Sequence, residues 1–173
     1  MYKVLIVDDE KIMRLAVKTI IRWEDNGFQL VGEAKDGENA LMMIERFRPD
    51  IVITDLKMPN MDGITLIKRL REENFQGKIL VLSNYGDFEL VRDAMKWGAS
   101  DYLLKVTMKA DELIKILKEV VQQIEKERSQ EEKGIQLPDM DMEALKEKYM
   151  RQALEDELDM ENQEKESKRL GIS

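Results

Sequence analysis

The chain has 173 residues, with 28 lysine and arginine residues against 36 aspartate and glutamate residues, and it contains no cysteine and no histidine. These absences exclude disulfides, thiolate metal sites, Ser-His and Cys-His nucleophile pairs and HExxH zinc helices. Any metal site must then use oxygen ligands, which favours Mg²⁺, Ca²⁺ or Mn²⁺. No apolar run approaches the ~18–20 residues of a membrane span, and acidic residues follow Val7 too early for a signal peptide. We therefore expect a cytoplasmic protein that does not enter a membrane.

The excess of negative charge is concentrated in the last part of the chain. Residues 1–128 carry 21 basic and 23 acidic side chains, whereas residues 129–173 carry 7 and 13. Because an acidic tail is poorly suited to holding phosphate backbones, we expect no DNA binding by this chain alone.

Short apolar runs alternate with stretches of helical periodicity through about the first 125 residues. The runs are rich in β-branched residues and too short for helices, which is typical of parallel strands covered on both faces. The strand candidates are residues 4–7, 28–32, 51–53, 79–82 and 101–104, of which the second and the last are weaker. The helical stretches between them are residues 12–21, 40–47, 64–70 and 88–95. This alternation predicts an α/β protein with a doubly wound, five-stranded parallel sheet between two layers of helices.

The last helical pattern of this series is unusually long and is followed by a second one. Its apolar stripe continues into a wholly polar run at 125–132, after which Gly134 and Pro138 break the pattern. A further helix is expected from about Asp141. Its apolar residues are Leu145, Tyr149, Met150, Leu154 and Leu158. Residues 127–173 are therefore predicted to be an acidic helical extension, as one helix, two helices or part of a coiled coil.

Reactive side chains end four of the five predicted strands. They are Asp8 and Asp9, Asp55, Ser83 and Lys105. One such residue is often only a helix N-cap, but capping alone does not explain three carboxylates, a hydroxyl and an amine at the edge where α/β sheets bind ligands. Three neighbouring carboxylates repel one another, and a cation such as Mg²⁺ relieves that repulsion. A carboxylate can also act as a nucleophile and form an aspartyl phosphate.

These residues resemble the receiver domains of two-component response regulators, over residues 1 to about 126. The matching segments are Ile6-Val7-Asp8-Asp9-Glu10, Asp55-Leu56-Lys57-Met58-Pro59-Asn60-Met61-Asp62-Gly63, Leu82-Ser83 and Gly98-Ala99-Ser100-Asp101-Tyr102-Leu103-Leu104-Lys105. The resemblance implies a CheY-like, flavodoxin-like fold with strand order 2-1-3-4-5. It implies a phosphoacceptor domain at 1–126 that receives its phosphoryl group from a sensor histidine kinase. Such a domain catalyses only its own phosphotransfer and dephosphorylation, so it is not an enzyme in the usual sense.

The resemblance also implies how the acidic residues would act. Asp55 would be the phosphoacceptor. Asp9 and Asp55 would bind Mg²⁺ directly, Asp8 would act mainly through water, and the main-chain carbonyl of Lys57 would be a further ligand.

Three further residues would act on the phosphoryl group or respond to it. Lys105 would pair with the phosphoryl group, Ser83 would hydrogen-bond it, and Tyr102 would be the switch aromatic, or otherwise an ordinary strand tyrosine. One departure from the family is Val106, because proline in a cis bond usually follows the lysine. A non-proline cis bond costs roughly 2.5–4 kcal/mol, and a trans bond in its place would shift the aim of Lys105 and the start of the last helix, so the sequence leaves the geometry of this bond open.

Residues 83–89 and the ending Asp-Tyr-Leu-Leu-Lys resemble a narrower group, the YesN-like regulators. These join a receiver through a helical segment to an AraC-type helix-turn-helix domain. Residues 127–173 would then be the linker to a DNA-binding domain that this chain does not contain. The alternative is a stand-alone receiver whose helical tail provides the output, and in either case we expect a homodimer.

Three other functions fit the sequence less well. An aspartyl-nucleophile phosphatase of the haloacid dehalogenase type would carry an Asp-x-Asp motif on its first strand, whereas the candidate nucleophile here follows the third. A pseudo-receiver would have lost the reactive residues, which are all present. A nucleotide-binding fold would show a GxGxxG or GxxxxGK(S/T) loop after the first strand, and neither motif occurs there.

Overall fold

The structure is a computed structural model that describes residues 1–133 and 142–169. The chain forms two units, Met1–Leu137 and Pro138–Ser173. The helix breaks predicted at Gly134 and Pro138 lie outside the described residues.

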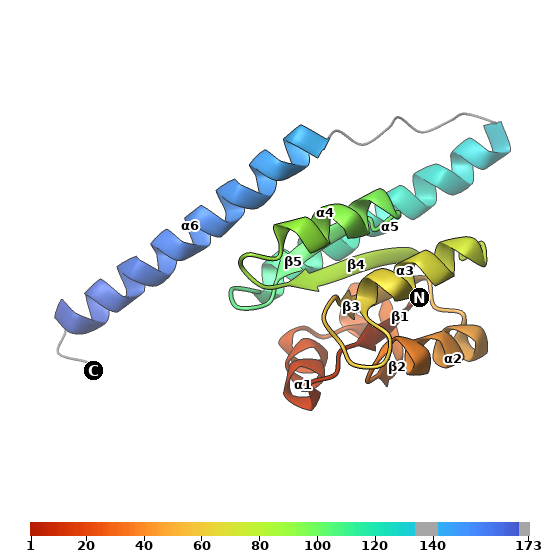
Figure 1. The fold of residues 1–173 in the computed structure, drawn as a ribbon, viewed down its shortest axis with the longest axis horizontal. Coiled ribbons are helices and arrows are strands. Elements are labelled where there is room, and N and C mark those ends of the chain that lie inside the picture. The colour runs from red at the N-terminus through yellow and green to blue at the C-terminus, as the bar shows by residue number, and fades with distance from the viewer. Residues whose placement is uncertain (134–141, 170–173) are drawn as a thin grey trace. The chain divides into compact units, whose positions relative to one another are not determined.

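The first unit contains one sheet of five strands (Figure 1). The strands are β1 (Tyr2–Val7), β2 (Phe28–Ala34), β3 (Ile51–Asp55), β4 (Lys78–Ser83) and β5 (Asp101–Leu104). Every neighbouring pair is parallel, and the order is β2-β1-β3-β4-β5. The predicted doubly wound sheet with order 2-1-3-4-5 is therefore confirmed. Because all five strands run in one direction, their carboxyl ends lie along one edge of the sheet.

A helix follows each strand, as the periodicity predicted. The helices are α1 (Lys11–Ile20), α2 (Gly37–Phe47), α3 (Gly63–Glu72), α4 (Phe88–Lys96) and α5 (Ala110–Lys133), and a short 3₁₀ helix, η1, spans Glu24–Asn26. Two of them begin after an aspartate whose side chain caps the helix. Asp36 accepts a hydrogen bond from the main-chain N–H of Asn39, and Asp62 accepts one from that of Thr65, both at 2.8 Å. These caps fix where α2 and α3 start relative to the strand ends.

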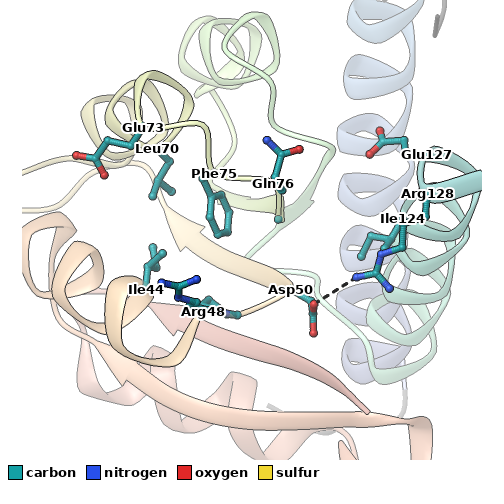
Figure 2. A pocket seen from close by; sticks show the side chains of 12 residues that line it. Ile44, Arg48, Asp50, Leu70, Glu73, Phe75, Gln76, Ile124, Glu127 and Arg128 are labelled. Atoms are coloured by element: carbon teal, nitrogen blue, oxygen red, sulfur yellow. Dashed lines mark ion pairs between the residues drawn. The ribbon is translucent and has the colours of Figure 1, made fainter. Parts of the chain in front are cut away.

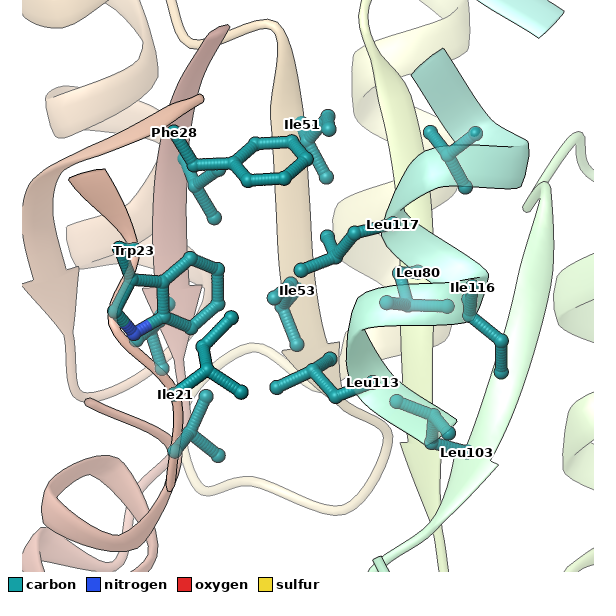
Figure 3. Close-up of a cluster of buried hydrophobic side chains, with 14 of the residues drawn as sticks. Ile21, Trp23, Phe28, Ile51, Ile53, Leu80, Leu103, Leu113, Ile116 and Leu117 are labelled. Atoms are coloured by element: carbon teal, nitrogen blue, oxygen red, sulfur yellow. The ribbon is translucent and has the colours of Figure 1, made fainter. Parts of the chain in front are cut away.

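Helices α1 and α5 cover one face of the sheet, where most of a continuous apolar cluster lies (Figure 3). Leu113 and Leu117 of α5 point toward the sheet from one side, and Trp23 and Phe28 lie opposite them. The two aromatic rings pack edge to face with centroids 6.3 Å apart. Successive strand residues point to opposite faces, so the other buried set of each strand faces the layer in which α2 contacts α3 and α3 contacts α4. Burial on both faces holds the strand ends firmly in place.

The fifth helix runs unbroken from Ala110 to Lys133, which confirms its unusual length. The domain boundary predicted at residue 126 falls within this helix and stays a prediction. The second unit contains α6 (Met142–Arg169), on which Met150, Leu154 and Leu158 are exposed. Within residues 1–133 and 142–169, no helix combines the length and the apolar character needed to cross a bilayer.

Candidate functional site

Four strand ends meet at the carboxyl edge of the sheet. Asp8 directly follows β1, Asp55 is the last residue of β3, Ser83 is the last residue of β4, and Lys105 directly follows β5. The main-chain N–H of Lys105 donates a hydrogen bond of 2.8 Å to the carbonyl of Ser83, which continues the pairing of β4 and β5 by one residue. The sheet register therefore carries Lys105 toward the acidic residues.

The ammonium of Lys105 bridges two buried carboxylates. Its Nζ lies 2.8 Å from Oδ2 of Asp55 and 3.1 Å from Oδ2 of Asp8, and all three side chains are at most 7% exposed. The other carboxylate oxygens accept main-chain hydrogen bonds. Oδ1 of Asp8 accepts from the N–H of Glu10 at 2.9 Å, and Oδ1 of Asp55 accepts from that of Leu56 at 2.7 Å. The structure thus brings three of the predicted site residues into one buried ionic cluster.

Burial and charge shift the pKa values of two members of this cluster. Burial raises the pKa of Asp8, and the hydrogen bond from Glu10 and the charge of Lys105 only partly oppose that shift. Burial by itself would lower the pKa of Lys105, but its hydrogen bonds and its attraction to Asp55 and Asp8 outweigh burial and raise it. Lys105 therefore stays cationic at neutral pH and compensates part of the negative charge of the two aspartates.

The β1–α1 loop adds two exposed acids beside Asp8. Carboxylate oxygens of Asp8, Asp9 and Glu10 all lie within 4.8 Å of one another. An oxygen-only set with one buried and two exposed carboxylates fits Mg²⁺, which keeps several waters when it binds to protein. Glu10 was not among the predicted ligands, although its position directly after the aspartate pair was a usable signal.

Lys57 has a side-chain contact that the sequence did not predict. Its ammonium pairs with Asp87 at 3.0 Å, across the loops that follow β3 and β4. The proposed role of its main-chain carbonyl stays a prediction.

The hydroxyl and aromatic residues of the predicted switch are both buried. Ser83 is fully buried, and its Oγ has no hydrogen-bond partner among the described residues. Tyr102 is 1% exposed. Ser83 is therefore able to donate a hydrogen bond to a new acceptor nearby, and the switch role of Tyr102 stays a prediction.

Hydrogen bonds that the sequence did not predict tie the β3–α3 loop to the start of α2. Asp36 accepts a hydrogen bond of 2.9 Å from Nδ2 of Asn60, in addition to its cap of α2, and these hydrogen bonds lower the pKa of Asp36. The N–H of Gly37 donates to the carbonyl of Met61 at 3.0 Å. Asp36 and Asn60 are 24 positions apart, so no local pattern could have paired them.

The start of α3 lies very close to the end of β3. A Cβ atom on Gly63 would lie 2.2 Å from the main-chain oxygen of Asp55, so only glycine fits at this position. The close approach holds the candidate phosphoacceptor rigidly between its strand and the following helix.

No peptide bond among the described residues is cis, so the bond between Lys105 and Val106 is trans. The sequence had left this geometry open. Lys105 contacts both aspartates with this trans bond in place.

A cavity of about 510 Å³ lies near the opposite edge of the sheet, next to the amino ends of β3 and β4 (Figure 2). Ile44, Phe75 and Ile124 contribute to its apolar walls, and Asp50 and Arg128 form an ion pair of 3.7 Å beside it. None of the reactive residues lines this cavity.

Comparison with known proteins points to one family. A sequence model of the response regulator receiver domain matches residues 4–118. The chain is 40% identical over 127 residues to the uncharacterized transcriptional regulatory protein YesN of Bacillus subtilis. This alignment covers 73% of this chain and 34% of that protein. It is 40% identical over 105 residues to the transcriptional regulatory protein HptR of Staphylococcus aureus, which covers 61% of this chain and 41% of that protein. The chain therefore spans well under half the length of these relatives.

Solved structures give the same result. The receiver domain of AraT, a response regulator from Geobacillus stearothermophilus, superposes with a TM-score of 0.68 at 37% identity and covers 73% of this chain and 98% of that one. A two-component transcriptional regulator AraC from Clostridium phytofermentans superposes with a TM-score of 0.68 at 31% identity. The match covers 75% of this chain and 100% of that one.

Proposed function

Because this chain belongs to the family of response regulator receiver domains, we propose that it works as a switch by accepting a phosphoryl group on Asp55. Receiver domains are signalling domains rather than typical enzymes, and they interact with sensor histidine kinases. The single observation that carries the proposal is the ion pair between Asp55 and Lys105, since it places a buried carboxylate next to the cation that would neutralise a phosphoryl group.

The proposed reaction is a phosphoryl transfer from a phosphohistidine of the kinase. A carboxylate oxygen of Asp55 attacks phosphorus, the P–N bond to histidine breaks, and the histidine nitrogen leaves with the bonding electron pair. The ammonium of Lys105 stays close to the transferred group, because its attraction to Asp55 and Asp8 already holds it there. Asp8, Asp9, Asp55 and the carbonyl of Lys57 would hold Mg²⁺, which when bound offsets the negative charge of the transferring phosphoryl group.

The proposed switch starts at Ser83. Its buried Oγ, which has no hydrogen-bond partner among the described residues, would donate to an oxygen of the new phosphoryl group. That hydrogen bond would draw in the end of β4 and change the packing of Tyr102 on β5. A displacement of this kind biases a two-state element, as phosphorylation switches generally do.

The proposed output is transcription, through a longer parent protein. The relatives are named transcriptional regulators, and this chain spans well under half of their length. DNA binding would belong to the part of such a protein beyond this chain, because the acidic tail is poorly suited to hold DNA.

We also propose that the chain forms a homodimer through its tail. Met150, Leu154 and Leu158 are each more than half exposed on α6, at positions that fall on one side of a helix. Pairing with the same stripe of a second chain would remove this apolar surface from water.

Phosphorylation can be tested directly by intact-mass analysis after treatment with acetyl phosphate and Mg²⁺. The chain should gain the mass of one phosphoryl group, and Asp55→Asn should gain none. Asp62→Asn is a matched control in the same loop, because asparagine also caps a helix and should leave labelling unchanged. Equal labelling of Asp55→Asn would contradict the assignment of Asp55.

A further inference from the structure

An ion pair connects the two loops that carry the candidate phosphoacceptor and its hydroxyl partner. Lys57 stands two positions after Asp55, and Asp87 stands four positions after Ser83. Nζ of Lys57 lies 3.0 Å from Oδ1 of Asp87, whose side chain is 8% exposed, whereas the Lys57 side chain is 66% exposed. The pair therefore joins a fixed, buried carboxylate to a cation that solvent reaches.

Asp87 is fixed because its carboxylate also closes the β4–α4 turn. Its Oδ2 accepts a hydrogen bond of 3.0 Å from the N–H of Asn84, and its own N–H donates to the carbonyl of Asn84 at 3.2 Å. Its carbonyl accepts from the N–H of Val91 at 2.9 Å, in the first turn of α4. Any force on the Asp87 carboxylate therefore acts on the whole turn between Ser83 and α4.

We propose that the Lys57–Asp87 pair is a clasp that holds the β4–α4 loop in its unphosphorylated position, with Asp87 as a positioning residue for Ser83. This inference rests on the proposed phosphorylation of Asp55. The proposed switch moves Ser83, and with it the β4–α4 loop, toward a phosphoryl group on Asp55, and the clasp joins that loop to the β3–α3 loop. A contact made in only one of two states shifts the equilibrium toward that state.

Phosphorylation itself would open the clasp. A phosphoryl group on Asp55 adds negative charge only two positions from Lys57, so it would compete with Asp87 for the exposed ammonium. Released from Lys57, the Asp87 carboxylate would no longer tie its turn to the β3–α3 loop, and Ser83 would be free to follow the phosphoryl group.

The clasp is tested with Asp87→Asn, which removes the charge and keeps an oxygen that accepts from Asn84. The initial rate of phosphorylation by acetyl phosphate should rise about two- to fivefold, the range expected for a partly exposed ion pair. In a Lys57→Met background, Asp87→Asn should change nothing further, because the clasp is already absent. Glu89→Gln is the control, since it removes an exposed ion pair with Arg92 within α4 and should leave the rate unchanged.

A second measurement needs no phosphate. Amide hydrogen exchange of residues 84–91 in the unphosphorylated chain should be two- to fivefold faster in Asp87→Asn, again only when Lys57 is present. An equal effect of Asp87→Asn with and without Lys57, or no effect in either measurement, would overturn the clasp. A wild-type chain that takes up no phosphate but shows the exchange effect would contradict the proposed function and leave the clasp in place.

Discussion

Nζ of Lys105 lies 2.8 Å from Oδ2 of Asp55, in a site where both side chains are 7% exposed. The cation that would pair with the phosphoryl group is therefore already paired with the proposed phosphoacceptor before phosphate arrives. Because the same cation also contacts Asp8, Lys105 contributes both to the stability of the fold and to the proposed reaction.

Replacing Lys105 with methionine should leave two buried carboxylates without a cation. Breaking a buried ion pair on one side typically costs 3–5 kcal/mol, so we expect the free energy of unfolding to fall by about 3 kcal/mol without metal. Mg²⁺ should restore more stability to this variant than to wild type, as urea unfolding would measure. Lys18→Met, which breaks a half-exposed pair with Glu33, is the control and should cost less than about 1 kcal/mol. Equal losses in both variants would contradict the compensating role of Lys105.

If the acidic cluster of the folded chain is the proposed Mg²⁺ site, Mg²⁺ should stabilise the chain by mass action, because the unfolded chain would not offer that cluster. Asp9→Ala should remove the Mg²⁺-dependent rise in melting temperature, while its metal-free stability stays equal or rises as repulsion between carboxylates falls. Glu45→Ala, on an exposed position of α2, should keep the full rise. A wild-type melting temperature that does not change with millimolar Mg²⁺ would exclude a metal site of this kind.

Two glycine-to-alanine substitutions should differ in their cost to stability, because one new Cβ would meet the main chain and the other a flexible side chain. Gly63→Ala would place a Cβ 2.2 Å from the main-chain oxygen of Asp55, so the strand and helix must move apart, at a cost of about 2–3 kcal/mol. Gly32→Ala would place a Cβ 2.3 Å from the terminal methyl of Met43, which can rotate away, and at an ordinary contact distance of 3.6 Å from Leu5, so it should cost less than about 1 kcal/mol. Denaturant unfolding measures both, and the reverse ranking would be inconsistent with this packing.

The pH dependence of stability should report the contacts of Glu33. A hydrogen bond from Lys18 chiefly lowers the pKa of Glu33, helped by Arg14, which lies 2.9 Å away, against the opposing effect of burial. Since the folded-state pKa is below the unfolded value of 4.5, this contribution is present above that pH and is lost as pH falls through the folded pKa. Stability should therefore fall less steeply on acidification in Glu33→Gln than in wild type. Chemical denaturation measures the free energy of unfolding of both proteins between about pH 6 and pH 3. If this free energy fell equally steeply with pH in Glu33→Gln and in wild type, the proposed contribution of Glu33 would be contradicted.

The proposed homodimer should depend on the exposed stripe of α6. Sedimentation of the 173-residue chain should show a dimer that Leu154→Ser with Leu158→Ser weakens, because both changes reduce the apolar surface available for pairing. Truncation after Arg128 should have the same effect. Met42→Ser, at an exposed apolar position on α2, should leave the dimer intact. A chain that stays monomeric at high micromolar concentration, with and without phosphate, would refute pairing through the tail.

The sequence by itself determined the strands, the fold class and the reactive edge. Runs such as Ile51-Val52-Ile53 are apolar at every position because a parallel strand is buried on both faces, and this signal is local. The polar residues that end these runs, among them Asp55 and Ser83, were identifiable because each directly follows such an apolar run. Parallel strands then bring their carboxyl ends together wherever those residues stand in the chain.

Only the tertiary structure decided which side chains pair across that edge. Lys105 contacts Asp8 and Asp55, and Lys57 contacts Asp87, because the sheet register and the lengths of four separate loops set where each side chain ends. Such pairs join residues dozens of positions apart and leave no periodic trace. A charged residue in a loop looks the same in the sequence whether its side chain forms an ion pair across the site or points into water. Its partner is therefore known only from the packed fold.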